Sequence, residues 1–221
     1  MKKKKIKIKT PDKWTEFIIK EMNYVLPDDC RGGVVVDCGC NVGAFELVYE
    51  TRFDKYYCFD ASEQNLQILH KNLEQTNVEF EAAQKACWKE SGQIKKVMAH
   101  SNCDGEIDYF GNSGNFSIVE ATNPDGISGH QLKNSIDEVE TISIEEIIDK
   151  FSPIKVLKVD IEGGEFEFLL NKDLSKIEFI VGEIHNSKSL QWLRLIKFIT
   201  KTHRITYTDY EHVFTFRNKN E

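Results

Sequence analysis

Short hydrophobic runs alternate with longer amphipathic stretches along most of the chain. The runs at 34–36 and 55–60 are typical of strands that are buried on both faces of a sheet. Apolar residues spaced by three and four positions predict helices through AFELVYE and over 62–75. Because strand and helix alternate, the pattern predicts a mainly parallel sheet with right-handed crossovers.

The alternation continues toward the end of the chain. Further strands are predicted near 78–82, 94–98, 154–159 and 177–184. Further helices are predicted over 12–25, after Ser143, at 165–171 and at 187–202. The buried face predicted for the last helix comprises Leu190, Leu193, Ile196 and Ile199. The final strands, 204–208 and 212–217, lie around TDYE, too close together for a parallel crossover, so they form an antiparallel hairpin.

One segment breaks this pattern. Residues 100–135 are rich in Asn, Ser, Gly and Asp, with the apolar patches YFGNSGNF and SIVEA. A stretch of this length inside a compact domain is usually a lid, a binding loop or disordered. At 221 residues the chain has the length of one α/β domain. We therefore predict a basic tail over 1–10 and a single domain over 11–221 with an inserted loop near 100–135.

The net charge of −7 hides an asymmetry, because six of the 29 Lys and Arg residues lie in MKKKKIKIK. The remaining 23 basic residues stand against 36 acidic ones, a balance of −13. A body this acidic is a poor partner for a phosphate backbone, so we expect no nucleic-acid substrate. The lysine-rich start is a solvated arm, an edge strand, or a tether to a membrane or nucleic acid.

Membrane and secretion signals are missing from the sequence. No apolar run approaches the ~20 residues of a transmembrane helix, and no signal-peptide core follows the lysines. We therefore expect a cytoplasmic protein with no transmembrane segment. The six cysteines are scattered and form no paired CxxC clusters, which predicts buried thiols rather than zinc ligands or disulfides.

The turn DCGCNVG follows the first strand, where an open α/β sheet binds its ligand. Its pattern lacks the middle glycine that lets a dinucleotide pyrophosphate approach the backbone, which argues against NAD or FAD. A cofactor with an amino-acid tail and no phosphates tolerates Asn41, which can adopt the left-handed conformation. The alternative is a plain tight turn. The candidate cofactor contacts in this turn are Asp37, Gly39, Cys40, Asn41, Val42 and Gly43.

A second candidate contact, Asp60, ends the next strand 23 residues after Asp37. An acid at about this distance from the glycine turn holds a ribose hydroxyl pair. Asp60 could instead cap the following helix, but Ser62 can fill that role. Lys85 and Ala86, after the third strand, are weaker candidates for contacts with an adenine base, and Trp88 is predicted to be a packing residue.

Together, VVVDCGCNVGAFEL, YCFDASEQNLQILHKNL, KACWKESG and LKVDIEGGEFEFL resemble the FkbM family of methyltransferases over roughly 30–190. The family's Lys-x-Asp-x-Glu-Gly-x-Glu signature is matched by Lys158, Asp160, Glu162, Gly163 and Glu165. The resemblance implies a Rossmann-like seven-stranded α/β sheet, methyltransferase activity and S-adenosylmethionine as cofactor. This sequence has Asp60-Ala61 where the family usually has Glu-Pro, so Ala61 joins the candidate contacts.

Carboxylates gather around this signature. Asp160 at a strand tip and Glu162 in the turn are aimed at the crevice, where either can remove a proton from an acceptor hydroxyl. The alternative is a turn and helix cap. We expect Glu165 to steady the start of the next helix and Glu167 to face solvent.

The neighbouring strand ends in Glu183, His185 and Asn186, which we expect to face Asp160. His185 is predicted to be either a general base or a structural histidine that is bonded to a carboxylate. A third hypothesis is a magnesium ion that bridges Asp160 and Glu183 or Asn186, as in catechol-type O-methyltransferases. The FkbM resemblance does not by itself imply a metal.

The leading functional hypothesis is an S-adenosylmethionine-dependent methyltransferase that acts on a hydroxyl of a sugar, glycan or natural product. The hydroxyl rests on the family resemblance alone. The runner-up is an N-methyltransferase that acts on an amide or amine of a peptide or small molecule. A cofactor-binding protein without catalysis and an NAD-dependent reductase are the remaining alternatives.

Overall fold

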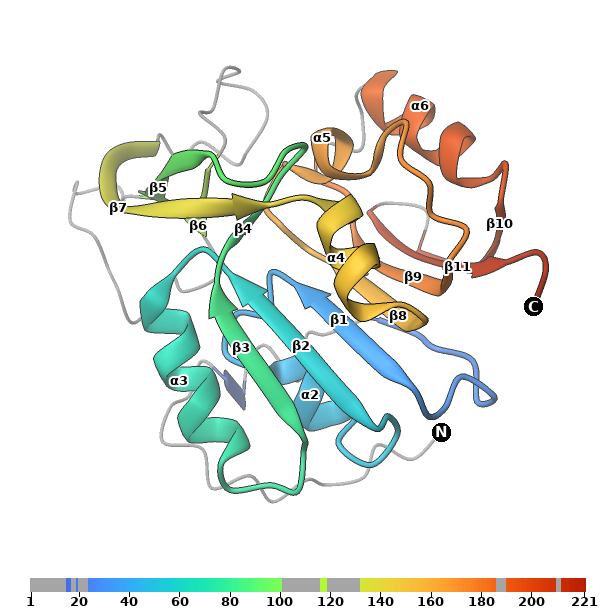
Figure 1. The fold of residues 1–221 in the computed structure, drawn as a ribbon, viewed down its shortest axis with the longest axis horizontal. Helices are drawn as coiled ribbons and strands as arrows, with labels where there is room; N and C mark the ends of the chain where they lie inside the picture. Colours follow the sequence, from blue (N-terminus) through green and yellow to red (C-terminus); the bar gives the residue numbers. More distant parts are fainter. Residues whose placement is uncertain are drawn as a thin grey trace.

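The computed structural model describes residues 15–16, 19, 24–100, 116–118, 132–185, 190–209 and 212–221. A seven-stranded sheet with the order β10-β11-β9-β8-β1-β2-β3 forms its centre (Figure 1). Its strands are β1 (Val34–Cys38), β2 (Lys55–Asp60), β3 (Phe80–Gln84), β8 (Ile154–Val159), β9 (Ile177–Glu183), β10 (His203–Thr208) and β11 (Val213–Asn218). The five strands from β9 to β3 are parallel, whereas β11 runs antiparallel to both β9 and β10. The predicted parallel sheet with a C-terminal hairpin is confirmed.

Helices cover both faces of this sheet, because the central strands are apolar on both sides. In β1, Val35 packs into the core with α2 and α3, while Val36 packs on the opposite face with α4, α5 and α6. Figure 1 shows α4 in front of the sheet and α2 behind it. The helices are α2 (Ala44–Val48), α3 (Glu63–Leu73), α4 (Ile144–Phe151), α5 (Glu165–Leu169) and α6 (Leu190–Ile199).

The face predicted for α6 is partly wrong. Leu195 and Ile199 are the fully buried residues of this helix, whereas Leu190 and Leu193 are 74% and 55% exposed. The spacing of apolar residues predicted the helix but not which of its sides faces the core. All four positions proposed for the buried face are apolar, and so is Leu195.

A second sheet lies beyond the carboxyl ends of the central strands, and the arrows of β1, β2 and β3 point toward it in Figure 1. Its order is β4-β7-β5-β6. The strands are β4 (Ala86–Cys87), β5 (Ile94–His100), β6 (Phe116–Ser117) and β7 (Leu132–Ile142). The strand expected near 94–98 is therefore real, but it pairs antiparallel with β7 and is not part of the parallel sheet. An antiparallel pair of this kind needs no crossover helix.

Several predicted segments lie largely outside the described residues. They are the tail over 1–10, most of the helix over 12–25, and 101–115 and 119–131 of the predicted loop. Two parts of the predicted loop 100–135 are strand in the structure, namely β6 and the start of β7. Among the described residues, five cysteines are buried and free, which confirms the predicted thiols, and no helix is long and apolar enough to cross a membrane.

The carboxyl ends of β1 and β8 touch through their backbones. Asp160 N–H donates to the Cys38 carbonyl at 3.0 Å, and Gly39 adopts a φ of 79°. A Cβ atom on Gly39 would lie 1.8 Å from the Asp160 carbonyl oxygen. Only glycine therefore allows the first turn to pass so close to the signature strand.

We expect Gly39→Ala to destabilise the protein far more than Gly92→Ala. Gly92 has a similar φ of 75° but nothing within 4 Å of its Cβ position, so its substitution costs only the left-handed strain of about 1–2 kcal/mol. At Gly39 the backbone clash is added to this strain. Urea unfolding of both variants measures the difference, and equal losses of unfolding free energy would contradict the close approach of β1 and β8.

Candidate functional site

A pocket lies at the carboxyl ends of β1, β2 and β8, beneath the second sheet. It is lined by Gly39, Asn41, Phe59, Asp60, Ala61, Asn65, Lys85, Ala86, Cys87, Ile118, Asp160, Ile161 and Glu162. An open parallel sheet binds its ligands at this edge, where the strand order reverses about β1. The pocket therefore combines an apolar wall with carboxylates at two of its sides.

The structure brings eight of the predicted site residues to this pocket. They are Gly39, Asn41, Asp60, Ala61, Lys85, Ala86, Asp160 and Glu162. Six others do not line it, namely Asp37, Cys40, Val42, Gly43, Glu183 and His185. The sequence analysis missed Phe59, Asn65, Cys87, Ile118 and Ile161. Their signal is weak, because apolar residues of a pocket wall have the same pattern as core residues.

Asp60 is held rigidly at the end of β2. One carboxylate oxygen, Oδ2, accepts from Asn41 N–H at 2.9 Å, and Oδ1 accepts from Ser62 N–H at 2.8 Å and Asn65 Nδ2 at 3.2 Å. Burial raises the pKa of Asp60, while the Ser62 and Asn41 amides oppose that rise. The predicted left-handed Asn41 is confirmed with a φ of 50°, and Ser62 caps α3 as expected.

The remaining residues of the turn after β1 do not line the pocket but support it from inside the protein. Cys40 and Val42 are buried, the Val42 carbonyl accepts from Asn72 Nδ2 at 2.8 Å, and Gly43 N–H donates to the Cys40 carbonyl at 3.0 Å. Gly43, the N-cap residue before α2, has a φ of 81°. These residues shape the loop that presents Gly39 and Asn41 to the pocket.

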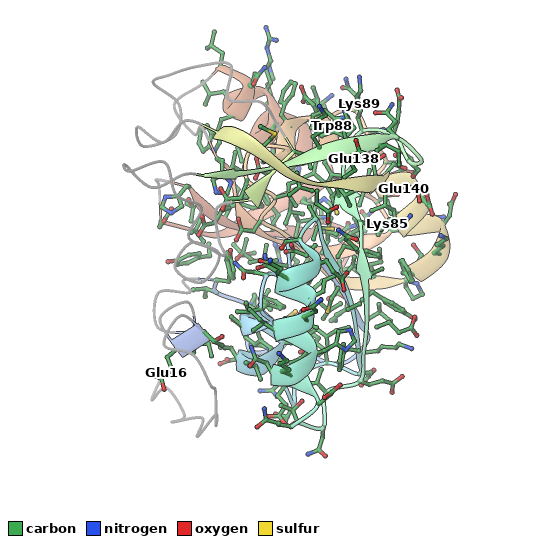
Figure 2. The ribbon with its side chains drawn as sticks, turned by 90° about the vertical axis from the view of Figure 1, so that its left-hand side faces the viewer. Glu16, Lys85, Trp88, Lys89, Glu138 and Glu140 are labelled. Carbon is green, nitrogen blue, oxygen red and sulfur yellow. The ribbon has the colours of Figure 1, made fainter. Side chains whose placement is uncertain are left out.

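Lys85 joins the two sheets at the edge of the pocket. Its backbone N–H donates to the Asp60 carbonyl at 3.0 Å, and its Nζ lies 2.8 Å from Glu140 Oε2 on β7. Figure 2 shows Lys85 and Glu140 near each other, with Trp88 on the second sheet. The Trp88 ring packs under Lys95 Nζ, 5.0 Å from the ring centroid, and does not line the pocket, in line with a packing role.

Asp37 forms a buried ion pair with Lys158. Lys158 Nζ lies 3.0 Å from Asp37 Oδ1, the two side chains are 5% and 0% exposed, and the same ammonium group donates to the Gly39 carbonyl. Burial by itself would lower the pKa of Lys158, but the charges of Asp37 and Asp160 raise it instead. Lys158 is therefore a permanent cation beneath the pocket, a role that the sequence analysis did not assign to this signature residue.

Asp37 shares this interior with a second acid. Glu46 of α2 is fully buried, and Cys58 Sγ donates to its Oε1 at 3.3 Å. Burial, and then the charge of Asp37, raise the pKa of Glu46 well above its ordinary value. Burial also raises the pKa of Asp37, against the opposing effect of Lys158. The arrangement favours a protonated Glu46 and a negative charge on Asp37, next to the positive charge of Lys158.

Asp160 connects this interior to the pocket. Tyr24 Oη donates to Asp160 Oδ2 at 2.7 Å, and Lys158 Nζ lies 3.9 Å from the same oxygen. Burial, and then the charge of Asp160, raise the pKa of Tyr24 well above its ordinary value, so its hydroxyl keeps its proton. Tyr24 was not predicted as a site residue, because 136 positions separate it from Asp160 in the sequence.

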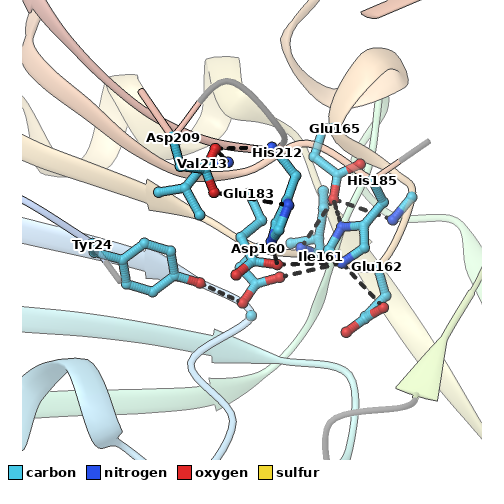
Figure 3. A network of polar contacts seen from close by, with 12 residues as sticks. Tyr24, Asp160, Ile161, Glu162, Glu165, Glu183, His185, Asp209, His212 and Val213 are labelled. Atoms are coloured by element: carbon cyan, nitrogen blue, oxygen red, sulfur yellow. Dashed lines mark hydrogen bonds and ion pairs between the residues drawn. The ribbon is translucent and has the colours of Figure 1, made fainter. Parts of the chain in front are cut away.

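His185 lies among four carboxylates (Figure 3). Its Nδ1 lies 2.8 Å from Glu165 Oε1, which also accepts from Gly163 N–H at 3.1 Å. Burial by itself would lower the pKa of His185, but the charges of Glu165, Glu162 and Asp160 raise it well above its ordinary value. Of the two predicted roles, this geometry favours a structural histidine that is bonded to a carboxylate over a general base.

The other face of His185 points toward the remaining acids. Its Nε2 lies 3.3 Å from Glu162 Oε2, 3.8 Å from Asp160 Oδ1 and 3.9 Å from Glu183 Oε2. Burial, together with Asp160, Glu165 and Glu183, raises the pKa of Glu162 to about 8, although His185 opposes the rise. His212, from the turn between β10 and β11, lies 4.0 Å from Glu183 and was also missed. Asn186 lies outside the described residues.

Glu165 fulfils its predicted structural role only in part. Its carboxylate accepts from the Ile161 and Gly163 amides of the preceding turn, at 3.4 and 3.1 Å, but its tightest contact is with His185. Glu165 is 1% exposed, so this contact is inside the protein. Glu167, which was expected in solvent, is only partly exposed.

Comparisons with known proteins identify the family. A family model, the Methyltransferase FkbM domain, matches residues 37–217. The crystal structure of methyltransferase FkbM from Methylobacillus flagellatus is similar over 87% of this chain and 45% of its own chain, at 17% identity and a TM-score of 0.50. This chain therefore spans less than half of that protein. The match confirms both the predicted FkbM resemblance and the predicted Rossmann-like fold.

Two further solved structures are more distant. M. capricolum TrmK, in complex with S-adenosyl-homocysteine, covers 96% of this chain and 70% of its own at 15% identity and a TM-score of 0.44. An rRNA methylase from Streptococcus thermophilus covers 93% of both chains at 12% identity and a TM-score of 0.47. No curated protein matches the chain.

We expect Lys158→Met to lower the free energy of unfolding by about 3–5 kcal/mol, because it leaves the buried charge of Asp37 unpaired. Lys155→Met is the matched control on the same strand. Its ion pair with Glu178, at 2.7 Å, is partly exposed on both sides, so its loss costs about 1 kcal/mol or less. Denaturant unfolding measures both values. Similar losses of unfolding free energy for the two variants would contradict the expectation that the buried ion pair stabilises the protein more than the partly exposed one.

Proposed function

The chain belongs to the FkbM methyltransferase family, and on that premise we propose that it methylates a hydroxyl group of a sugar, glycan or natural product with S-adenosylmethionine as methyl donor. One observation carries the proposal beyond the family. The pocket places a rigid aspartate, Asp60, on one side and two further carboxylates, Asp160 and Glu162, on the other. Asp60 suits the ribose of a nucleoside, and Asp160 with Glu162 suits an acceptor group that must lose a proton.

The residues on the β2 side fit the cofactor. The amides of Asn41 and Ser62 and the amide nitrogen of Asn65 orient the Asp60 carboxylate, whose Oδ2 accepts only from Asn41 among these donors and keeps a lone pair for a ribose hydroxyl. Lys85 and Ala86 continue the same wall toward the adenine base. Gly39, whose backbone packs against that of Asp160 and lines the pocket, would lie beside the amino-acid part of the cofactor. Asp37 is buried under Lys158, so it contributes through that ion pair and not by direct contact.

The acceptor would occupy the side of Asp160 and Glu162. The Tyr24 hydroxyl already donates to Asp160 Oδ2, so this oxygen is occupied by a partner inside the protein. Glu162 is therefore our choice for the group that takes the hydroxyl proton. Its Oε2 lies 3.3 Å from His185 Nε2, which places the side chain beside the group of acids around this histidine. Glu183 stands behind His185 and completes the acidic surroundings.

The proposed reaction is an in-line displacement. S-adenosylmethionine supplies a sulfonium methyl group, whose carbon–sulfur bond breaks with its electron pair left on sulfur as the acceptor oxygen forms the new carbon–oxygen bond. The hydroxyl proton passes to the Glu162 carboxylate, so charge and atoms balance. The protein's main contribution is alignment, which can supply about 7–11 kcal/mol of the barrier.

We expect the wild-type protein to bind S-adenosylmethionine and Asp60→Asn to bind it about 10- to 100-fold more weakly, because the charge-assisted hydrogen bond to the ribose becomes weaker. Asp54→Asn is the control, since Asp54 precedes the opposite end of β2 and is exposed. Titration calorimetry measures all three affinities. Absence of wild-type binding at high micromolar cofactor would refute the proposed cofactor.

Substitution of the acceptor side should slow catalysis without loss of cofactor affinity. We expect Glu162→Gln to lower kcat by about 10²- to 10⁴-fold, the usual contribution of a general base, with the dissociation constant of S-adenosylmethionine changed by less than about threefold. Glu167→Gln, on the following helix, is the control with unchanged turnover. Transfer of a labelled methyl group to candidate acceptors provides the rate. Nuclear magnetic resonance of the product identifies the methylated atom, and an N-methyl product would favour the amide or amine alternative.

A further inference from the structure

We propose that Asp160, Glu183 and His185 form a binding site for a divalent transition-metal ion beside the pocket. One ligand atom from each residue lies within 4.8 Å of the other two. Asp160 follows β8, Glu183 ends β9 and His185 follows it, so two neighbouring parallel strands deliver the three side chains to one point. Figure 3 shows the three side chains converging there.

The orientation of His185 supports a metal ligand. Its Nδ1 is bound to Glu165 Oε1 at 2.8 Å, and Glu165 is itself 1% exposed and fixed by the Gly163 amide. The other nitrogen, Nε2, is thereby turned toward Asp160 and Glu183. A histidine that ligates a metal almost always binds a carboxylate or carbonyl through its second nitrogen, which fixes the orientation of the ring. Glu165 is in the place of that supporting carboxylate.

The charge around Nε2 also calls for a cation. Four carboxylates, from Asp160, Glu162, Glu165 and Glu183, surround His185, and the Lys158 ammonium group is already paired with Asp37. The Asp160 Oδ1 atom is buried and has no hydrogen-bond partner among the residues that the structure describes. A divalent ion at this point would displace the proton of His185 Nε2 to solvent, satisfy the Asp160 oxygen and balance the excess negative charge.

The distances are those of a site that needs a small adjustment to bind its ion. His185 Nε2 lies 3.8 Å from Asp160 Oδ1 and 3.9 Å from Glu183 Oε2. With bonds of about 2.0–2.2 Å, ligand atoms around one ion are roughly 3–3.5 Å apart, so side-chain rotation suffices. One imidazole and two carboxylates suit manganese, iron or zinc better than magnesium, which prefers oxygen ligands.

The metal would have a direct role in catalysis, and this part of the inference rests on the proposed function. Asp160 belongs both to the pocket wall and to the metal site. Three protein ligands leave coordination positions for an acceptor hydroxyl, and a bound cation makes that hydroxyl a stronger acid. The hydroxyl proton still goes to Glu162, whose Oε2 lies 3.3 Å from His185 Nε2.

Binding of manganese to the full chain tests the site without any substrate. The protein is treated with a chelator, dialysed, and titrated with Mn²⁺ while electron paramagnetic resonance measures the free ion. We expect one Mn²⁺ per chain, and modulation of the electron spin echo by one histidine nitrogen. This second signal comes from the wild-type protein, so the test does not depend on the folding of a variant.

The variants locate the site. His185→Gln and Glu183→Gln should each weaken Mn²⁺ binding at least tenfold, and Glu165→Gln, which only orients the ring, by about 10- to 100-fold. Glu178→Gln, on the same strand as Glu183, and His70→Gln, on the exposed face of α3, are matched controls that should leave the affinity unchanged.

Two results would overturn the metal site, namely no binding at 1 mM Mn²⁺, or binding that lacks the histidine signal and survives the ligand substitutions. The same chelated protein is titrated with S-adenosylmethionine. Cofactor binding without metal binding would reject this inference and leave the proposed function standing, whereas metal binding without cofactor binding would reject the function alone.

Discussion

The buried ammonium group of Lys158 is the contact on which the rest of the site depends. It pairs with Asp37 at the end of β1, donates to the Gly39 carbonyl in the first turn, and lies 3.9 Å from Asp160 beyond the end of its own strand. Because Asp37 is fully buried, it would be strongly destabilising without this cation. One charge thus fixes the two strand ends between which the pocket opens.

Basic and acidic side chains alternate in space, starting from Lys158. Asp160 lies between the cations of Lys158 and His185, and His185 lies between Asp160 and Glu165. Each buried carboxylate therefore has a cation or a backbone amide nearby, which is how acidic side chains are kept inside a protein. The negative charges of Glu162 and Glu183 are the least well compensated by nearby cations, since burial and their acidic neighbours raise the pKa of both. The chemistry is accordingly expected around these two side chains.

Local sequence patterns predicted what local interactions determine. The strands at 55–60 and 154–159, the cap at Ser62 and the left-handed Asn41 follow from spacing and residue type. The second sheet did not, because β5 and β7 pair across a stretch that reads as a loop and has no helical period. Within the site, Lys158 was recognised as part of the signature but its buried ion pair with Asp37 was not predicted, and Tyr24 reaches Asp160 from 136 positions away. Contacts of that kind arise from topology, which no short window of sequence contains.

The pocket has one half that is built from local contacts and one half that is built from contacts between distant segments. The half around Asp60 is built from the turn after β1 and the start of α3, so one continuous stretch of chain determines it. The half around Asp160 is assembled from Tyr24, the signature turn, the end of β9 and the turn before β11. A change in any of these distant segments would reshape the half around Asp160 and leave the half around Asp60 in place. On the proposed function, such an architecture would let the acceptor change while the methyl donor stays the same, because only the second half would have to be rebuilt.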